Sequence, residues 1–129
     1  MSIVLQGAGG ALSAGLLVVR LVLGLGIAAH GAQKVLGWFG GRGLAGTGAF
    51  LEAMGFRPGA RFAALAGLGE IAGGLLVAVG LLGPVGPAII TAVMVVAIVT
   101  AHWKNGFFVT AGGYETALMY IVGASAIAF

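Results

Sequence analysis

Residues 62–102 decide the fold, and they read FAALAGLGEIAGGLLVAVGLLGPVGPAIITAVMVVAIVTAH. Two apolar runs, residues 62–82 and 85–102, flank the turn sequence GPVGP at residues 83–87. A helix needs about 20 residues to cross the ~30 Å hydrocarbon core of a bilayer. Proline and glycine favour a tight turn followed by a new helix start. The stretch therefore predicts two antiparallel membrane helices joined by a short, uncharged turn.

Two more apolar runs lie outside this stretch, at residues 12–36 and 114–129. The chain is 60% hydrophobic and 7% charged, whereas about a quarter of the residues in soluble domains are charged. We therefore predict an all-α membrane protein, an antiparallel bundle of four transmembrane helices in one domain that covers residues 1–129. No Lys or Arg precedes Arg20, so the first run lacks the positive start of a secretory signal and is expected to remain as a membrane helix.

The long connection at residues 37–61 is expected to contain a short amphipathic helix over residues 47–56. Thr47 is a suitable N-cap for this helix, and Gly55 is suitable for ending it. Its apolar side chains at helical spacing share one face. They are Phe50, Leu51 and Met54.

Basic residues gather on one side of the predicted bundle. The connections at residues 37–61 and 103–113 share that side, and the first run ends there. Together they hold every Lys and Arg except Arg20, namely Lys34, Arg42, Arg57, Arg61 and Lys104. The positive-inside rule therefore places both connections in the cytoplasm and both termini outside. The basic residues form no stripe with aromatic residues, so the lipid bilayer, rather than a nucleic acid, is the expected partner.

Small residues recur every four positions in the first two runs. Gly24, Ala28 and Ala32 do so in the first run, and Gly69 and Gly73 in the second. Such spacing lets helix backbones approach closely in lipid. We therefore predict that these runs pack closely against neighbouring helices.

Six ionisable side chains lie in or at the ends of the apolar runs: Arg20, His30, Lys34, Glu70, His102 and Glu115. Such a group at membrane depth costs at least ~2.5–3.5 kcal/mol, so it requires a partner, a wet cavity or a function. At a rise of ~1.5 Å per residue, His30 and Glu70 lie roughly 9 and 12 Å from the basic side. All six except Arg20 fall toward that side, where they predict a polar site.

Three interpretations of this site remain open. The first is a buried clamp in which acids and bases neutralise one another and fix the helix register. Its pairs would be Glu70 with Lys34 or His30, and Glu115 with His102 or Lys104.

The second interpretation is a ligand pocket, in which His30 donates to a carbonyl of a quinone head and Glu70 relays the proton. The third is a metal site of two His and two Glu residues, which lacks any short ligand spacing such as HExxH. We favour the first two interpretations, and assign no metal site and no catalytic residue.

Arg20 differs from the other five residues, because it lies roughly 24 Å from the basic side. Glu70 is about 12 Å away along the membrane normal. Arg20 is therefore expected to extend toward the uncharged face. The alternatives are contact with Glu70 through a wet interior, or with an acid or lipid phosphate from outside the chain.

The chain resembles the DoxX family of small membrane proteins over residues 15 to 120. The resemblance is carried by Arg20 through Gly24, by His30-Gly31-x-Gln33-Lys34 and by Phe39-Gly40-Gly41. It continues in Ala66-Gly67-x-x-Glu70-x-x-Gly73-Gly74, and in His102 followed by Gly106-Phe107-Phe108 and Glu115. The resemblance implies a four-helix membrane bundle.

The resemblance also suggests two functions. Related DoxD-type proteins are associated with thiosulfate:quinone oxidoreductase, and other relatives with membrane complexes for thiol and oxidative stress. It therefore implies a subunit of a redox-linked complex in a bacterial cytoplasmic membrane, with quinone as the candidate cofactor. The alternative is a non-catalytic scaffold or accessory subunit that binds other subunits or its own copies. Whether the chain is itself an enzyme stays open, but it contains no Cys and so performs no thiol exchange.

Overall fold

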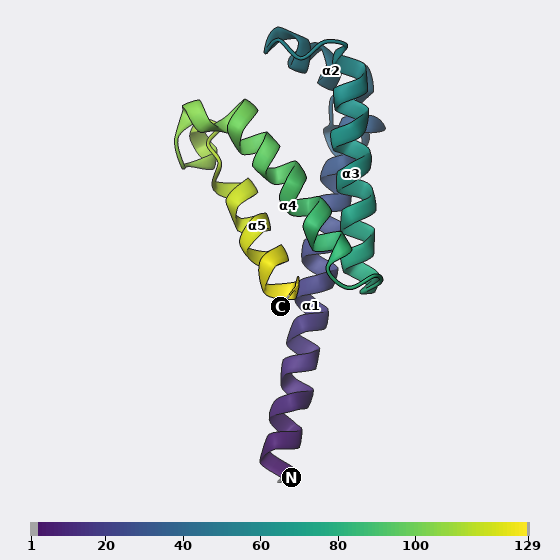
Figure 1. Cartoon of the computed structure of the whole chain (residues 1–129), viewed down its shortest axis with the longest axis vertical. Coiled ribbons are helices and arrows are strands. Elements are labelled where there is room, and N and C mark those ends of the chain that lie inside the picture. The colour runs from purple at the N-terminus through teal and green to yellow at the C-terminus, as the bar shows by residue number, and fades with distance from the viewer. Residues whose placement is uncertain (1–2, 129) are drawn as a thin grey trace.

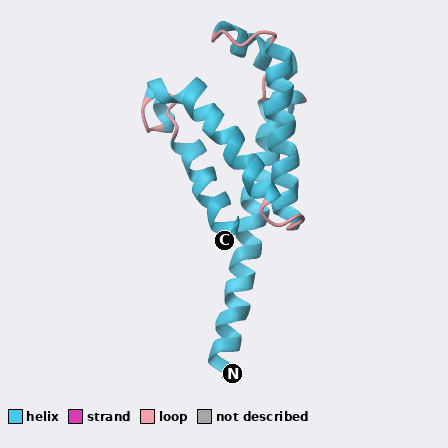
Figure 2. Ribbon diagram, viewed as in Figure 1, coloured by secondary structure: helices cyan, strands magenta, loops and turns pink. Residues whose placement is uncertain are grey.

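The computed structural model describes residues 3–128, and these residues form helices, turns and loops without a strand (Figures 1 and 2). The α-helices are α1 (Ile3–Val35), α2 (Gly43–Ala53), α3 (Gly59–Val79), α4 (Val85–Ala97) and α5 (Glu115–Ala128). A π-helical turn, Ile98–His102, continues α4. Short 3-10 turns lie at Trp38–Gly40, Trp103–Asn105 and Val109–Ala111. The predicted all-helical fold is therefore confirmed.

Three helical segments are long and apolar enough to cross a bilayer. They are Gly9–Val35, Gly59–Val79 and Val85–Asn105. The fourth apolar helix, α5, has 14 residues, which at ~1.5 Å per residue is shorter than the ~30 Å hydrocarbon core. The fourth membrane crossing therefore stays a prediction.

A tight turn joins α3 to α4, as the GPVGP sequence predicts. Gly80 ends α3 in the left-handed conformation, with a φ of 70°. The Gly80 and Leu81 amides donate to the carbonyls of Val77 and Leu76 at 3.2 and 3.0 Å. This glycine-based ending satisfies the last carbonyls of the helix. Helix α3 therefore ends at Val79, three residues before the predicted Leu82. Pro84 directly precedes α4.

Glycines bring α1 and α3 into backbone contact. A Cβ atom on Gly24 would lie 2.6 Å from the Ala78 amide nitrogen, and one on Gly74 would lie 2.7 Å from that of Ala28. Farther along the pair, Gly31 faces the Gly67 carbonyl. Any larger residue would force the two helices apart. This contact includes Gly24 and Ala28 of the predicted small-residue pattern.

A second face of α3 packs against α4 through glycines. A Cβ atom on Gly69 would lie 3.1 Å from Val93 Cγ2, and one on Gly73 would lie 3.1 Å from Ile90 Cγ1. The predicted Gly69 and Gly73 pair therefore faces α4, while α1 packs on the other glycine face. The buried core lies among α1, α3, α4 and α5, and consists of Ile27, Val77, Ile90, Met94, Ala117 and Ala124.

The short helix α2 differs from its prediction. It begins at Gly43 rather than at Thr47, and Thr47 is buried inside it, so the predicted Thr47 N-cap is wrong. The reason is the packing of α2 on the start of α3. A Cβ atom on Gly48 would lie 2.9 Å from the Ala60 amide nitrogen. The centre of α2 therefore lies at this contact, and the helix extends back toward the preceding loop.

Helix α1 is longer than predicted and projects beyond the other helices. It has 33 residues, about 50 Å at ~1.5 Å per residue, and begins at Ile3 rather than Leu12. Its first half extends past the α3–α4 turn in Figure 1, and every residue from Gly9 to Val19 is exposed. This segment, residues 9–19, is called the projecting half below.

The glycine contacts predict a strong difference between two positions of the same helix. Gly24→Leu should destabilise the protein by about 1–3 kcal/mol or more, because the new side chain overpacks the α1–α3 contact. Gly15→Leu is the matched control, since nothing lies within 4 Å of a Cβ at Gly15, and it should change stability by no more than ~0.5 kcal/mol. Unfolding in detergent measures both variants, and equal effects would contradict the assigned packing.

Candidate functional site

A partly buried ion pair joins α1 to α3. The Lys34 ammonium donates to Oε1 of Glu70. The Glu70 side chain is 0% exposed and the Lys34 side chain 33% exposed. The second carboxylate oxygen, Oε2, is buried and has no hydrogen-bond partner among the described residues. Glu70 with Lys34 is one of the pairings that the sequence predicts.

The glycine contact between α1 and α3 brings the two helices close enough for Lys34 to reach Glu70. A Cβ atom on Gly67 would lie 3.3 Å from Cβ of Lys34. Gly67 and Glu70 are three residues apart and therefore share a face of α3. The Lys34 stem thus crosses α3 at Gly67, and its ammonium reaches Glu70 one turn farther along.

A cavity of about 370 Å³ lies among α2, α3 and α4, with Lys34 at its wall. Its lining is mainly apolar and aromatic, with Phe50, Leu51, Phe56, Phe62, Leu65, Val93 and Val96. Its polar side chains are Lys34, Thr47, Thr100 and His102. This space is called the α2–α4 cavity below. It combines an apolar wall with a small number of hydrogen-bonding groups, one of which is a cation.

Backbone carbonyls of the helix and of the following loop fix the polar groups at the π-helical end of this cavity. The Thr100 hydroxyl donates to the Val96 carbonyl at 2.6 Å. His102 Nδ1 lies 2.8 Å from the Gly112 carbonyl, which also accepts from the Asn105 amide at 3.1 Å. Because a carbonyl only accepts, Nδ1 of His102 carries the proton in this contact. In the neutral ring, Nε2 is then left as an acceptor.

Of the six predicted site residues, only Lys34 and His102 line the α2–α4 cavity. His30 is exposed, and its ring meets Tyr120 of α5 edge-to-face, with ring centroids 5.7 Å apart. Glu115 Oε1 accepts from the Val109 amide at 3.0 Å. The predicted pairing of Glu115 with His102 or Lys104 is therefore wrong, because backbone groups of the loop before α5 occupy both Glu115 and His102.

Arg20 lies at the opposite end of the helices, beside Gly80. A Cβ atom on Gly80 would lie 3.2 Å from a terminal nitrogen of Arg20. The predicted alternative of a contact between Arg20 and Glu70 is not formed, since Glu70 pairs with Lys34. The six predicted residues thus lie at four places. Lys34, Glu70 and His102 lie at the α2–α4 cavity or its ion pair, and His30 lies at the α1–α5 contact. Glu115 lies beside the loop before α5, and Arg20 lies at the α3–α4 turn.

Sequence reasoning missed three polar residues of this region. The sequence pattern of Thr47 favours a helix cap, and Thr100 lies inside an apolar run with no distinguishing signal. Glu52 lies outside the four apolar runs, yet it accepts from the Gly59 amide at 3.1 Å and so holds α2 on the start of α3. An acid followed seven residues later by a helix start is the available signal for this last contact.

The described residues bring no three His, Asp or Glu side chains together as a metal site would require. Comparison with known protein families gives one match. Residues 15–103 match the model of the DoxX family. The chain belongs to the DoxX family. The DoxX match includes both residues of the ion pair and every residue of the α2–α4 cavity, and it ends before α5. Neither a curated protein nor a solved structure matches the chain.

The ion pair predicts non-additive stability changes. Lys34→Met should destabilise the protein by about 3–5 kcal/mol, because it leaves the Glu70 carboxylate buried and unpaired. Adding Glu70→Met should recover part of this loss, since apolar residues often replace a buried ion pair at little cost.

Unfolding of the two single variants and the double variant in detergent gives the coupling energy. Lys104→Met is the control for loss of an exposed lysine, and should lie within ~0.5 kcal/mol of the parent. Strictly additive effects of Lys34→Met and Glu70→Met would contradict the pairing.

Proposed function

We propose that this DoxX-family protein binds a lipid-soluble molecule with a polar head, of the quinone class, in the α2–α4 cavity. The observation that carries the proposal is the cavity itself. Its volume of about 370 Å³ falls in the 300–1,000 Å³ range of small-molecule sites. Such sites have mainly apolar walls and few oriented polar groups, as this cavity does.

The polar groups suit the two redox states of a quinone head. A quinone carbonyl accepts hydrogen bonds, and the Lys34 ammonium has three donors, of which Glu70 takes one. A quinol hydroxyl donates, and Nε2 of neutral His102 accepts. Glu70, buried behind Lys34, is the proton-handling candidate. His30 is removed from this set because it lies outside the cavity.

The proposed setting is a four-span bundle in a bacterial cytoplasmic membrane. In it, α5 forms the fourth crossing, and local thinning of the bilayer accommodates its short length. The connections that carry Arg42, Arg57, Arg61 and Lys104 lie in the cytoplasm. The α2–α4 cavity then opens near the cytoplasmic face, within reach of the quinone pool of the membrane. Resemblance to redox-associated relatives supports a role in a larger quinone-linked complex.

Binding of a decyl-substituted benzoquinone to the purified protein tests this function. Ala97→Phe should lower the affinity about tenfold or more by filling the cavity, and Lys34→Met should lower it by a similar factor through the loss of a charged donor. His30→Ala is the matched control, and should leave the affinity unchanged. Unchanged affinity in both cavity variants would exclude this cavity as the binding site.

A second candidate function, that of an accessory subunit, is favoured by the projecting half of α1. Leu12, Leu17 and Val18 are each more than half exposed there. No other helix covers this segment in Figure 1. An apolar helix that extends beyond its own bundle has a surface available to another membrane chain.

This candidate predicts a partner at the projecting half. Because the chain contains no Cys, Leu12→Cys introduces a unique attachment point for a photo-crosslinker. Membranes of the native host should yield a cross-linked product with a second chain at this position. Val99→Cys, on an exposed apolar position of the π-helical turn, is the control and should yield less. A lone monomer from both variants would count against the accessory role.

A further inference from the structure

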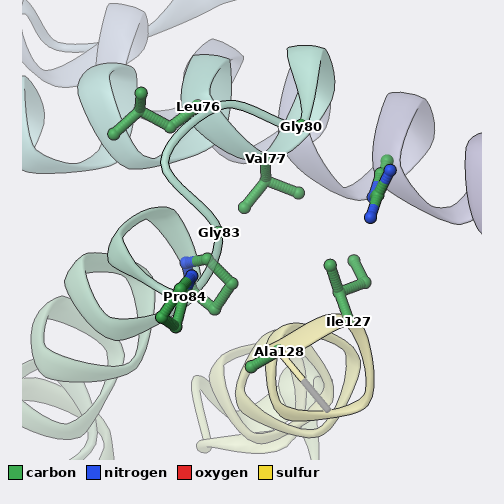
Figure 3. A pocket seen from close by; sticks show the side chains of 9 residues that line it. Leu76, Val77, Gly80, Gly83, Pro84, Ile127 and Ala128 are labelled. Carbon is green, nitrogen blue, oxygen red and sulfur yellow. The ribbon is translucent and has the colours of Figure 1, made fainter.

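A second cavity lies at the turn end of the helices, far from the α2–α4 cavity. It has a volume of about 250 Å³, room for roughly eight water molecules. Figure 3 shows its walls: Leu76 and Val77 from α3, Pro84 from the turn, and Ile127 and Ala128 from α5. Arg20 of α1 completes the lining. Four helices and the turn thus line a partly open space that contains one cation and, among the described residues, no other charged side chain.

The guanidinium of Arg20 has one buried donor without an acceptor in the described part of the chain. Its Nε is buried and has no hydrogen-bond partner among the described residues. One terminal nitrogen lies over Gly80. Gly80 cannot readily change to another residue, because its φ of 70° is strained for any side chain. An arginine stays charged in proteins, so its buried unpaired Nε requires an acceptor, and an anionic group best matches the charge.

No carboxylate side chain of this protein meets that requirement. The sequence contains three acids, which are Glu52, Glu70 and Glu115. Glu70 pairs with Lys34, Glu52 accepts from the Gly59 amide, and Glu115 accepts from the Val109 amide. Each acidic side chain is therefore engaged elsewhere, so none of the three supplies the counter-charge of Arg20.

We propose that this cavity binds the phosphate group of an anionic phospholipid. Guanidinium matches phosphate oxygens with two parallel donors. Gly83 and Pro84 at the cavity wall lead into the N-terminus of α4, whose positive dipole end also favours an anion. The site is thus electropositive although it lies away from the five other basic residues of the chain.

The surroundings select a lipid rather than a soluble anion. Beside the cavity, Val79, Leu81 and Leu82 are 72%, 57% and 60% exposed. A phospholipid whose phosphate binds Arg20 can keep its acyl chains against these side chains, which inorganic phosphate cannot do. The lining also offers no second cation to replace the many hydrogen bonds that a free phosphate makes in water.

Native mass spectrometry of the detergent-solubilised protein tests the site with phosphatidylglycerol, and with phosphatidylcholine as the zwitterionic lipid. The parent should retain phosphatidylglycerol at least about tenfold more tightly than phosphatidylcholine, from charge-assisted hydrogen bonds. Arg20→Gln should abolish this preference. Arg20→Lys keeps the positive charge but loses the two parallel donors of the guanidinium, and should give an intermediate preference. Arg61→Gln, an exposed arginine at the other end, is the matched control and should behave like the parent.

Thermal unfolding with added inorganic phosphate separates the two sources of the anion. The proposal expects no Arg20-dependent stabilisation by phosphate alone. Stabilisation by phosphate without a lipid preference would overturn it in favour of a soluble anion. Equal retention of both lipids by the parent, or a preference that survives in Arg20→Gln, would also overturn it. If Arg20→Gln does not fold, the Arg20→Lys variant decides. A preference for phosphatidylglycerol equal to that of the parent would then overturn the proposal, because the proposal depends on the two parallel donors of the guanidinium.

Discussion

The backbone contact between α1 and α3 is the constraint on which the rest of the structure depends. Gly24, Gly31, Gly67 and Gly74 remove the side chains that would separate the two helices. In lipid, where burial from water gives little drive between helices, close van der Waals contact is a main source of association. Only at this separation does the Lys34 side chain cross α3 at Gly67 and reach Glu70. The polar site is therefore a consequence of where glycines occur.

The position of α3 explains how two cavities arise in so small a protein. One glycine face of α3 contacts α1 and the other contacts α4. Near the start of α3, helix α2 packs on α3 but not on α4, and the space between α2 and α4 is the α2–α4 cavity. At the end of α3, the α3–α4 turn and the end of α5 enclose Arg20. The two cavities lie at opposite ends of one central helix, and each contains a single cation from α1.

The sequence was informative wherever one residue type has few alternatives. The prolines and glycines of residues 83–87 predicted the turn, and a Glu in an apolar run predicted a basic partner. The sequence was less informative where backbone groups competed with side chains. Glu115 and His102 bind loop amides and carbonyls, and such groups are present at every residue, so no pattern reveals them. The start of α2 was missed because Gly48, rather than a cap, fixes its position against α3.

The depth of Glu70 also bears on how the protein enters the membrane. As an isolated segment, α3 carries a carboxylate near its centre, which costs ~2.5–3.5 kcal/mol for insertion. Helix α1 is synthesised first and carries Lys34 in its last turn. A cation is therefore already at the membrane when α3 leaves the ribosome, and α1 can serve as an intramolecular chaperone for α3. The order of the two helices along the chain thus lets the earlier segment lower the barrier for the later one.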